Sequence, residues 1–138
     1  MNRIIIITRA SFIKNNKANI YQEFYLIESN NSLAMKPVLL SDSIDEKTNK
    51  NIINLISIIN ALDFVKDSLL PVFIYNDSKY CIEGIIKKKR KKNVELFDKI
   101  NELIQIRLML GEKTHFIFFP DYININNVLK HNCELIKN

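Results

Sequence analysis

Residues 71–85, PVFIYNDSKYCIEGI, indicate a buried strand that passes directly into a helix. The apolar run is typical of a central strand covered on both faces, and it reaches Asp77 and Ser78 just before a helical pattern begins. A carboxylate at the end of such a strand is a candidate metal ligand. Aspartate and serine are also common helix caps, because their side-chain oxygens accept backbone N–H groups. The rest of the chain decides between a catalytic and a structural Asp77.

The composition is that of a single globular domain over residues 1–138. Of these residues 47% are hydrophobic and 25% are charged, which argues against disorder. The two cysteines, Cys81 and Cys133, lack metal-ligand spacing, and we interpret them as reduced core thiols. The apolar run at residues 4–7 is too short for a membrane span or a signal peptide. We therefore expect an intracellular protein without a visible transit peptide, in a compartment that the sequence does not indicate.

The positive charge is concentrated in one run. The net charge is +5, from 20 basic and 15 acidic residues. Residues 87–92, KKKRKK, hold six of the basic residues, and without them 14 basic residues face 15 acidic ones, a net charge of −1. The basic excess of the chain therefore lies in this run.

Hydrophobic periodicity predicts elements in the order β-β-β-α-β-α-α-β-α. Strands are predicted over residues 3–9, 19–28, 33–40, 70–76 and 114–119. Helices are predicted over residues 48–65, from 78 into the basic run, over 94–110 after a cap at Asn93, and over 126–136. Pro37 places the third strand at an edge, since proline cannot donate to a ladder. Three successive strands favour an antiparallel meander, and strands reached through helices are expected to run parallel to the first. The fold class is therefore α/β, a five-stranded mixed sheet with helices on its faces.

Three segments, in the same order, resemble the ribonuclease H family of type 1. IYNDSKYCIEGI, residues 74–85, is similar to the family's strand that ends in Thr-Asp-Ser before an apolar helix. KNVELFDKINELI, residues 92–104, resembles the Lys-Asn-Val-Asp-Leu-Trp helix of the bacterial enzymes. FPDY, residues 119–122, stands where the family has a Val-Pro-Ala-His or Val-Lys-Gly-His turn. The resemblance implies a ribonuclease H-like fold over nearly the whole chain.

The resemblance also implies a metal site, which this sequence matches at one position. Family members hydrolyse a phosphodiester with two divalent metals about 4 Å apart, held by four carboxylates because magnesium prefers hard oxygen ligands. Asp77 matches the carboxylate of the fourth strand, whereas Arg9, in TRAS, stands at that of the first. The glutamate of the first helix falls on Asn54, in NLISIINAL. The last ligand falls on Asn132 or Cys133, depending on one gap, with Glu134 adjacent but out of register.

Three of the four ligands are therefore missing, so we expect a degenerate member without a bound metal or other cofactor. Arginine stays charged at any working pH and repels a metal from the pocket. We interpret Asp77 as a helix cap or a remnant of the ancestral site. A rearranged carboxylate set, which would again require magnesium, remains an alternative. Its candidate members are Glu23, Asp45, Glu46 and Asp121, with Tyr122 at the position of the family's loop histidine.

The basic run is the candidate nucleic-acid contact. In the family, a basic protrusion between the two middle helices grips the nucleic-acid backbone; here the charge lies at the helix junction itself. Adjacent cations bind phosphates without regard to base sequence, although a solvated surface run or a localisation signal are alternatives. Arg9 is expected to bind a phosphate through its guanidinium, and Asn51 matches an asparagine that in the family touches the minor groove of the hybrid. The cations are Lys87, Lys88, Lys89, Arg90, Lys91 and Lys92.

Three functions of different classes follow from these observations. The preferred hypothesis is a catalytically inactive ribonuclease H-like module that binds RNA or an RNA–DNA hybrid, as a subunit of a larger ribonucleoprotein or polymerase assembly. The first alternative is a divergent, metal-dependent ribonuclease that acts on RNA–DNA hybrids. The second is a protein–protein scaffold whose basic run contacts acidic protein. Divalent-metal binding distinguishes the nuclease from the others, and salt-dependent duplex binding distinguishes the module from the scaffold.

Overall fold

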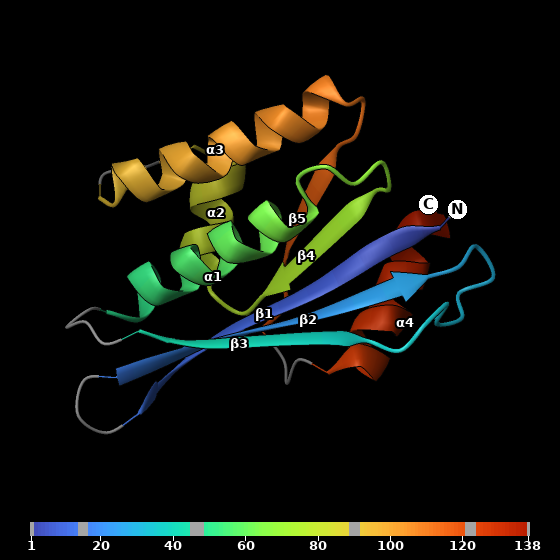
Figure 1. The fold of residues 1–138 in the computed structure, drawn as a ribbon, viewed down its shortest axis with the longest axis horizontal. Helices are drawn as coiled ribbons and strands as arrows, with labels where there is room; N and C mark the ends of the chain where they lie inside the picture. Colours follow the sequence, from blue (N-terminus) through green and yellow to red (C-terminus); the bar gives the residue numbers. More distant parts are fainter. Residues whose placement is uncertain (1, 14–16, 45–48, 89–91, 121–123, 138) are drawn as a thin grey trace.

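The chain forms a five-stranded mixed sheet with helices on both faces (Figure 1). The structure is a computed structural model that describes residues 2–13, 17–44, 49–88, 92–120 and 124–137. The elements are β1 (Arg3–Ile13), β2 (Lys17–Ile27), β3 (Val38–Ile44), α1 (Lys50–Val65), β4 (Val72–Asn76), α2 (Lys79–Ile86), α3 (Val94–Met109), β5 (Thr114–Phe118) and α4 (Ile125–Lys137). The strands lie in the order β3-β2-β1-β4-β5. β1, β2 and β3 pair antiparallel, while β4 and β5 run parallel to β1. The predicted element order and mixed sheet are confirmed.

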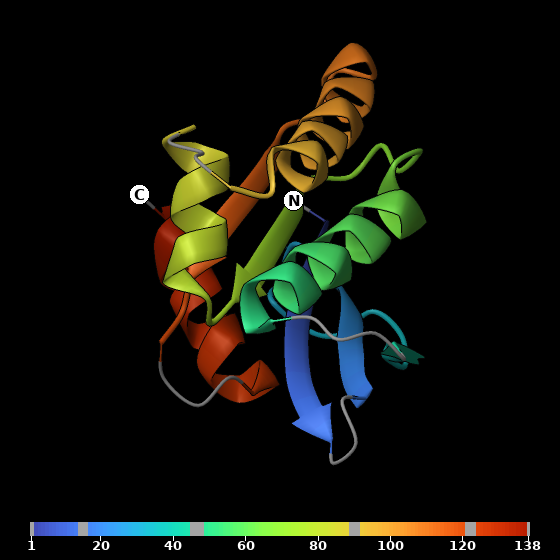
Figure 2. The same ribbon diagram turned by 90° about the vertical axis from the view of Figure 1, so that its left-hand side faces the viewer.

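The alternation of side chains along β1 divides the core into two layers. Ile6 contributes to a buried cluster with residues of α1, α2 and α3, and Ile5 and Ile7 contribute to one with Val128 of α4. Successive side chains of a strand point to opposite faces, so the three middle helices cover one face and α4 covers the other (Figure 2). Continuous isoleucine in β1 is therefore the pattern of a strand buried from both sides.

The third strand begins later than its apolar pattern predicts. The pattern predicts residues 33–40, and the strand lies at Val38–Ile44, at the edge of the sheet as predicted. Pro37 directly precedes the strand, because a residue without an N–H group is tolerated there. Leu33 forms only an isolated bridge with Ile27. The polar residues after Leu40 continue the strand because an edge strand leaves much of its surface in solvent.

Of the predicted helix caps, Asp77 is replaced by Ser78, and Asn93 stands at the cap position of α3 without a capping side-chain hydrogen bond. Ser78 caps α2, with its hydroxyl oxygen accepting a hydrogen bond from the Cys81 amide at 3.3 Å, whereas Asp77 is exposed just before it. Asn93 precedes α3 in a left-handed conformation, with φ 57°, and makes no side-chain cap. Its amide nitrogen donates instead to the Tyr80 hydroxyl at 3.1 Å. Asn49 caps α1, and residue 48, the predicted start, lies outside the described residues.

One cation on the buried face of α3, Arg107, is fully buried. Arg107 donates from Nε to the Thr114 hydroxyl at 2.8 Å. Its two terminal nitrogens donate to the carbonyls of Val65, Ser68 and Leu70 at 2.6–3.1 Å. A buried guanidinium is tolerated because its donors are satisfied. Arg107 therefore joins α3 to the end of α1 and to the loop before β4.

The cysteines are free thiols, as predicted. Cys81 is buried in the main core, and this burial raises the pKa of its thiol to about 11. Cys133 is half-buried on α4 rather than in the core. Among the described residues, no helix has the length and apolar character to cross a membrane.

Candidate functional site

The candidate site is an open cleft beside β1, at the point where the neighbouring β4 ends. β1 pairs with β4 over residues 4–7 but with β2 along its whole length, so its far half is open on the β4 side. A cleft of about 420 Å³ lies there, lined by Arg9, Ser11, Tyr21, Ser41 and Asp77 among others. The structure therefore brings together the two residues that match the first-strand and fourth-strand ligands of the family.

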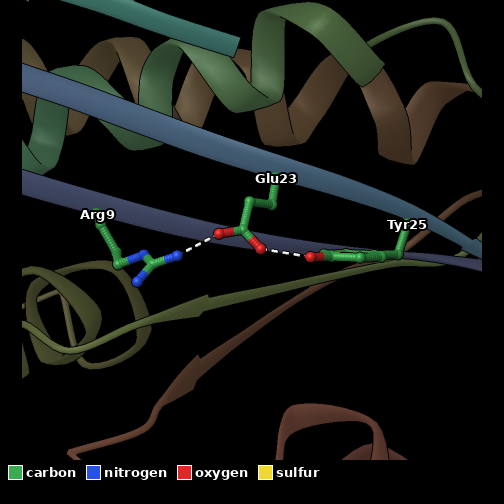
Figure 3. A network of polar contacts seen from close by, with 3 residues as sticks. All are labelled: Arg9, Glu23 and Tyr25. Carbon is green, nitrogen blue, oxygen red and sulfur yellow. Dashed lines mark hydrogen bonds and ion pairs between the residues drawn. The ribbon is translucent and has the colours of Figure 1, made fainter. Parts of the chain in front are cut away.

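Arg9 is paired with a glutamate on the neighbouring strand. Tyr21 lies opposite Arg9, and Glu23 is the next residue of β2 on the same face. A terminal nitrogen of Arg9 donates to one carboxylate oxygen of Glu23 (Figure 3). The guanidinium lies over the Tyr21 ring, 5.2 Å from its centroid. The Arg9 side chain is 35% exposed and that of Glu23 is 9% exposed. Arg9 is thus held at the cleft by a carboxylate behind it and an aromatic ring beside it.

Glu23 also accepts a hydrogen bond from Tyr25. The Tyr25 hydroxyl donates to the second carboxylate oxygen of Glu23 (Figure 3). Burial, and then this hydrogen bond, raise the pKa of Tyr25 well above its ordinary value, so the hydroxyl stays protonated and remains a donor. Both oxygens of Glu23 are therefore engaged within the sheet.

An uncharged network occupies the other side of the strand ends. Asn76, fully buried at the end of β4, donates to the Thr8 hydroxyl at 2.8 Å and to the side-chain oxygen of Asn54 at 3.2 Å. Its own side-chain oxygen accepts the Ser78 amide at 2.7 Å. Asn54, also fully buried, donates to the Lys50 carbonyl at 3.1 Å. Amides and a hydroxyl thus join β1, β4, α1 and the start of α2.

This donor set does not fit the two-metal centre that the resemblance implies. Asp77 is exposed at the cleft, the oxygen of Asn54 already accepts from Asn76, and Arg9 is a cation. In the described ranges of the chain, no three His, Cys, Asp or Glu side chains form a group able to hold a metal ion. Of the alternative carboxylates, Glu23 lies beside Arg9 and is engaged by it. Asp45, Glu46, Asp121 and Tyr122 lie outside the described residues.

The residues assigned to the last ligand position face a different part of the sheet. Asn132 of α4 is fully buried and accepts from Nε of Arg3 at 2.6 Å, and the Sγ of Cys133 lies 3.9 Å from a terminal nitrogen of Arg3. Arg3 and Arg9 both lie on β1, about 20 Å apart along the extended strand. The side-chain oxygen of Asn132 is thus engaged by the buried Arg3, and its side-chain nitrogen donates to the Tyr75 hydroxyl at 3.4 Å. The described contacts therefore do not join Asn132 or Cys133 to Arg9.

The basic run lies at the α2–α3 junction, as predicted. Lys87, Lys88 and Lys92 are exposed, and Lys87 pairs with Glu83 at 3.4 Å. Residues 89–91 lie outside the described part of the chain. Asn51 is exposed in the first turn of α1, and its carbonyl accepts from the Cys81 thiol at 3.6 Å. Nucleic-acid contact by these residues stays a prediction.

Sequence reasoning missed two parts of the site. The apolar pattern makes Asn76 only the last residue of a strand, although a polar amide in the otherwise apolar run VFIYN indicates a buried hydrogen bond. The sequence suggests Glu23 only as a candidate metal ligand and does not indicate its pairing with Arg9. Alternation along β1 and β2 puts Arg9, Glu23 and Tyr25 on one face once the strands are in register, but the pattern of neither strand alone specifies that register.

Comparison with solved structures identifies the fold. An RNase H1 isolated from compost by a metagenomic approach superposes with a TM-score of 0.65 and 22% identity, over 98% of this chain and 93% of that one. The same enzyme, LC11-RNase H1, in complex with an RNA/DNA hybrid has a TM-score of 0.63 and 20% identity over 86% of each chain. The amino-terminal RNase H domain of a Mycobacterium tuberculosis protein has a TM-score of 0.63 and 14% identity over 99% of each chain. No family model and no curated protein matches the sequence. From its sheet order, its helix layers and these superpositions, the chain has a ribonuclease H-like fold.

Proposed function

We propose that this protein is a ribonuclease H-like module without catalytic activity that binds nucleic acid. The proposed ligand is RNA or an RNA–DNA hybrid, and the proposed setting is an intracellular ribonucleoprotein or polymerase assembly. The observation that carries the proposal is the cleft that Arg9 and Asp77 both line. A guanidinium at a position where the family binds metal attracts a phosphate directly, because its planar N–H groups match phosphate oxygens.

Loss of catalysis is supported by the residues that surround the cleft. Hydrolysis by two metals needs several oxygen ligands that are free to bind. Arg9 supplies a positive charge there, and the Asn54 oxygen is engaged by Asn76. We therefore propose that no metal or other cofactor is required by the protein.

Binding of nucleic acid is supported by the fold and by the distribution of charge. A solved structure with this fold, LC11-RNase H1, contains a bound RNA/DNA hybrid. In this chain the basic excess is held by residues 87–92, whose described members, Lys87, Lys88 and Lys92, are exposed. Phosphate contacts of this kind give affinity that is independent of base sequence and falls with salt.

A salt titration tests the binding. Fluorescence anisotropy with a labelled RNA–DNA hybrid is measured for the wild-type protein and for a variant in which Lys88, Lys89, Arg90 and Lys91 are changed to Gln. This variant lowers the net charge from +5 to +1. The slope of log affinity against log salt is expected to fall by roughly one unit for each phosphate that the variant no longer binds, equally for hybrids of different sequence.

The control removes the same charge elsewhere. Changing Lys36, Lys66, Lys130 and Lys137 to Gln also lowers the net charge from +5 to +1, but at positions outside the α2–α3 junction. Equal slopes for the two variants would contradict a specific role of the basic run. Cleavage of the hybrid in magnesium or manganese, if it disappears in Asp77→Asn, would instead establish a divergent nuclease.

A further inference from the structure

A second groove lies along the free edge of β5. Among the described residues, β5 has a neighbouring strand on one side only. A groove of about 500 Å³ is lined there by side chains from α2, α3, β5 and α4. Thr114 and Phe116 point to one face of the sheet and His115 and Ile117 to the other, and all four line the groove. The groove therefore opens at the edge of the sheet rather than over one of its faces.

The backbone of β5 is suited to pairing with a further strand. In a parallel ladder, alternate residues direct both their N–H and C=O groups to the same neighbour. The Phe119 amide, just after β5, donates to the Asn76 carbonyl of β4 at 3.0 Å. By alternation, the backbone groups of Ile117 also point toward β4. The backbone groups of Phe116 and Phe118 consequently point away from β4. An edge of this kind is a template for an added strand.

The groove combines apolar side chains with positive charge. Ile86, Leu108 and Leu135 line it while remaining 59%, 45% and 43% exposed. Lys88 and Lys113 are its cations, and none of the described residues that line it is a carboxylate. A ligand with one apolar side and one acidic side would complement both features.

We propose that this edge binds an extended acidic segment of another protein, which adds to β5 as a sixth strand. Alternate apolar side chains of the segment would contact Ile86 and Leu108, and alternate carboxylates would face Lys113. A nucleic-acid strand fits less well, because its charged phosphates gain no favourable contact from the apolar lining. A second copy of this chain fits less well too, since it would bring another Lys88 and Lys113 to the same edge.

The probe is a fluorescein-labelled, acetylated peptide of three Glu-Val repeats, followed by anisotropy. We expect binding that weakens with salt, and no binding of the matching Lys-Val peptide. Alternate amides of a strand point to opposite edges. Methylating the amide nitrogens on one edge of the Glu-Val peptide should therefore lower its affinity at least about tenfold, and methylating those on the other edge should have little effect. This comparison leaves the protein itself unchanged.

Protein variants locate the binding at β5. Lys113→Glu and Ile86→Asp are each expected to lower affinity for the peptide at least about tenfold, because a like charge or a buried carboxylate disfavours the contact. The matched controls are Lys36→Glu and Leu39→Asp. They make the same changes of charge at the opposite edge of the sheet, where Lys36 precedes β3 and Leu39 lies on it. Each should leave the affinity for the peptide within about twofold.

Three results would overturn the proposal. The first is absence of binding by the Glu-Val peptide. The second is equal binding by the two methylated peptides, which would exclude strand addition. The third is displacement of the peptide by a single-stranded RNA whose own binding falls in Ile86→Asp, which would assign the groove to nucleic acid. Lys113 and Ile86 lie outside the basic run, so the two groove variants leave that run unchanged, although Lys88 belongs to both the run and the groove.

Discussion

Neutralising Glu23 should strengthen binding of a phosphate by Arg9. Glu23 is 7% exposed and accepts from Arg9 and from Tyr25. In Glu23→Gln the amide oxygen still accepts from Tyr25, so the fold is expected to persist. The guanidinium then keeps its full charge for the cleft, while the negative charge behind it is gone.

The size of the effect follows from Coulomb's law. A phosphate bound by Arg9 would lie roughly 6 Å from the Glu23 carboxylate, because one hydrogen bond of about 3 Å would join it to the guanidinium and a second joins the guanidinium to Glu23. Two unit charges at that distance repel by about 0.7 kcal/mol at a dielectric constant of ~80 and by about 3 kcal/mol at ~20. Since a tenfold change in affinity corresponds to about 1.4 kcal/mol, the affinity of Glu23→Gln for a hybrid should rise between about threefold and about a hundredfold.

Anisotropy with a labelled hybrid at about 0.1 M salt measures this change. The control, Glu28→Gln, removes the same charge just beyond β2, about 16 Å along the chain from Glu23. That separation exceeds the Debye length of about 10 Å, so its affinity should barely move. Equal affinities of Glu23→Gln and Glu28→Gln, with both proteins folded by circular dichroism, would refute a phosphate contact by Arg9.

Three further predictions concern the same strands and helices. Arg9→Asp combined with Asn54→Glu gives Asp77 two carboxylate neighbours, so calorimetry should detect magnesium binding; a folded double variant that takes up none would contradict the matching of these positions to the family. Burial raises the pKa of Tyr75 from 10.0 to about 12, so the unfolded chain ionises first as pH rises. The free energy of unfolding, from urea titrations, should fall between these pH values and fall less in Tyr75→Phe; an identical fall in both proteins would exclude this cause. Arg107→Met should lower the free energy of unfolding by about 3 kcal/mol or more, because it removes hydrogen bonds from a charged donor to buried carbonyls. A decrease below about 1 kcal/mol in the same titrations would contradict that role.

The sequence predicted the sheet and its helices because their patterns are local. Continuous isoleucine, alternation and helical spacing each report burial of a strand or a helix face. The predictions of strand bounds and side-chain contacts differ from the structure where a residue type suits more than one structural role. Pro37 falls within the predicted strand but directly precedes the observed one. Asn93 stands at the predicted cap position of α3, but its side chain donates to the Tyr80 hydroxyl rather than capping the helix. Arg107 fits the apolar spacing of α3, but the carbonyls that satisfy it come from distant segments.

The candidate site was predicted in part. Arg9 and Asp77 both line the cleft because Arg9 follows the part of β1 that pairs with β4, and Asp77 follows the end of β4. The sequence predicts that both strands end there, whereas β1 continues to Ile13. The partner of Arg9 depends on the register of an antiparallel hairpin, and that register is not encoded in either strand alone. The placement of Asn132 depends on the rotation of α4 and on the buried Arg3 that it contacts. These are tertiary properties, and a comparison of motifs does not contain them.

The amide network makes a carboxylate site difficult to build one substitution at a time. Asn54→Glu alone would bury an unpaired negative charge and remove the donor to the Lys50 carbonyl. Arg9→Asp alone would leave Glu23 buried beside a second carboxylate. Each single substitution therefore lowers stability before another ligand is present to share a metal, so the changes are epistatic. The present packing thus disfavours stepwise introduction of a metal site, independently of what the cleft binds.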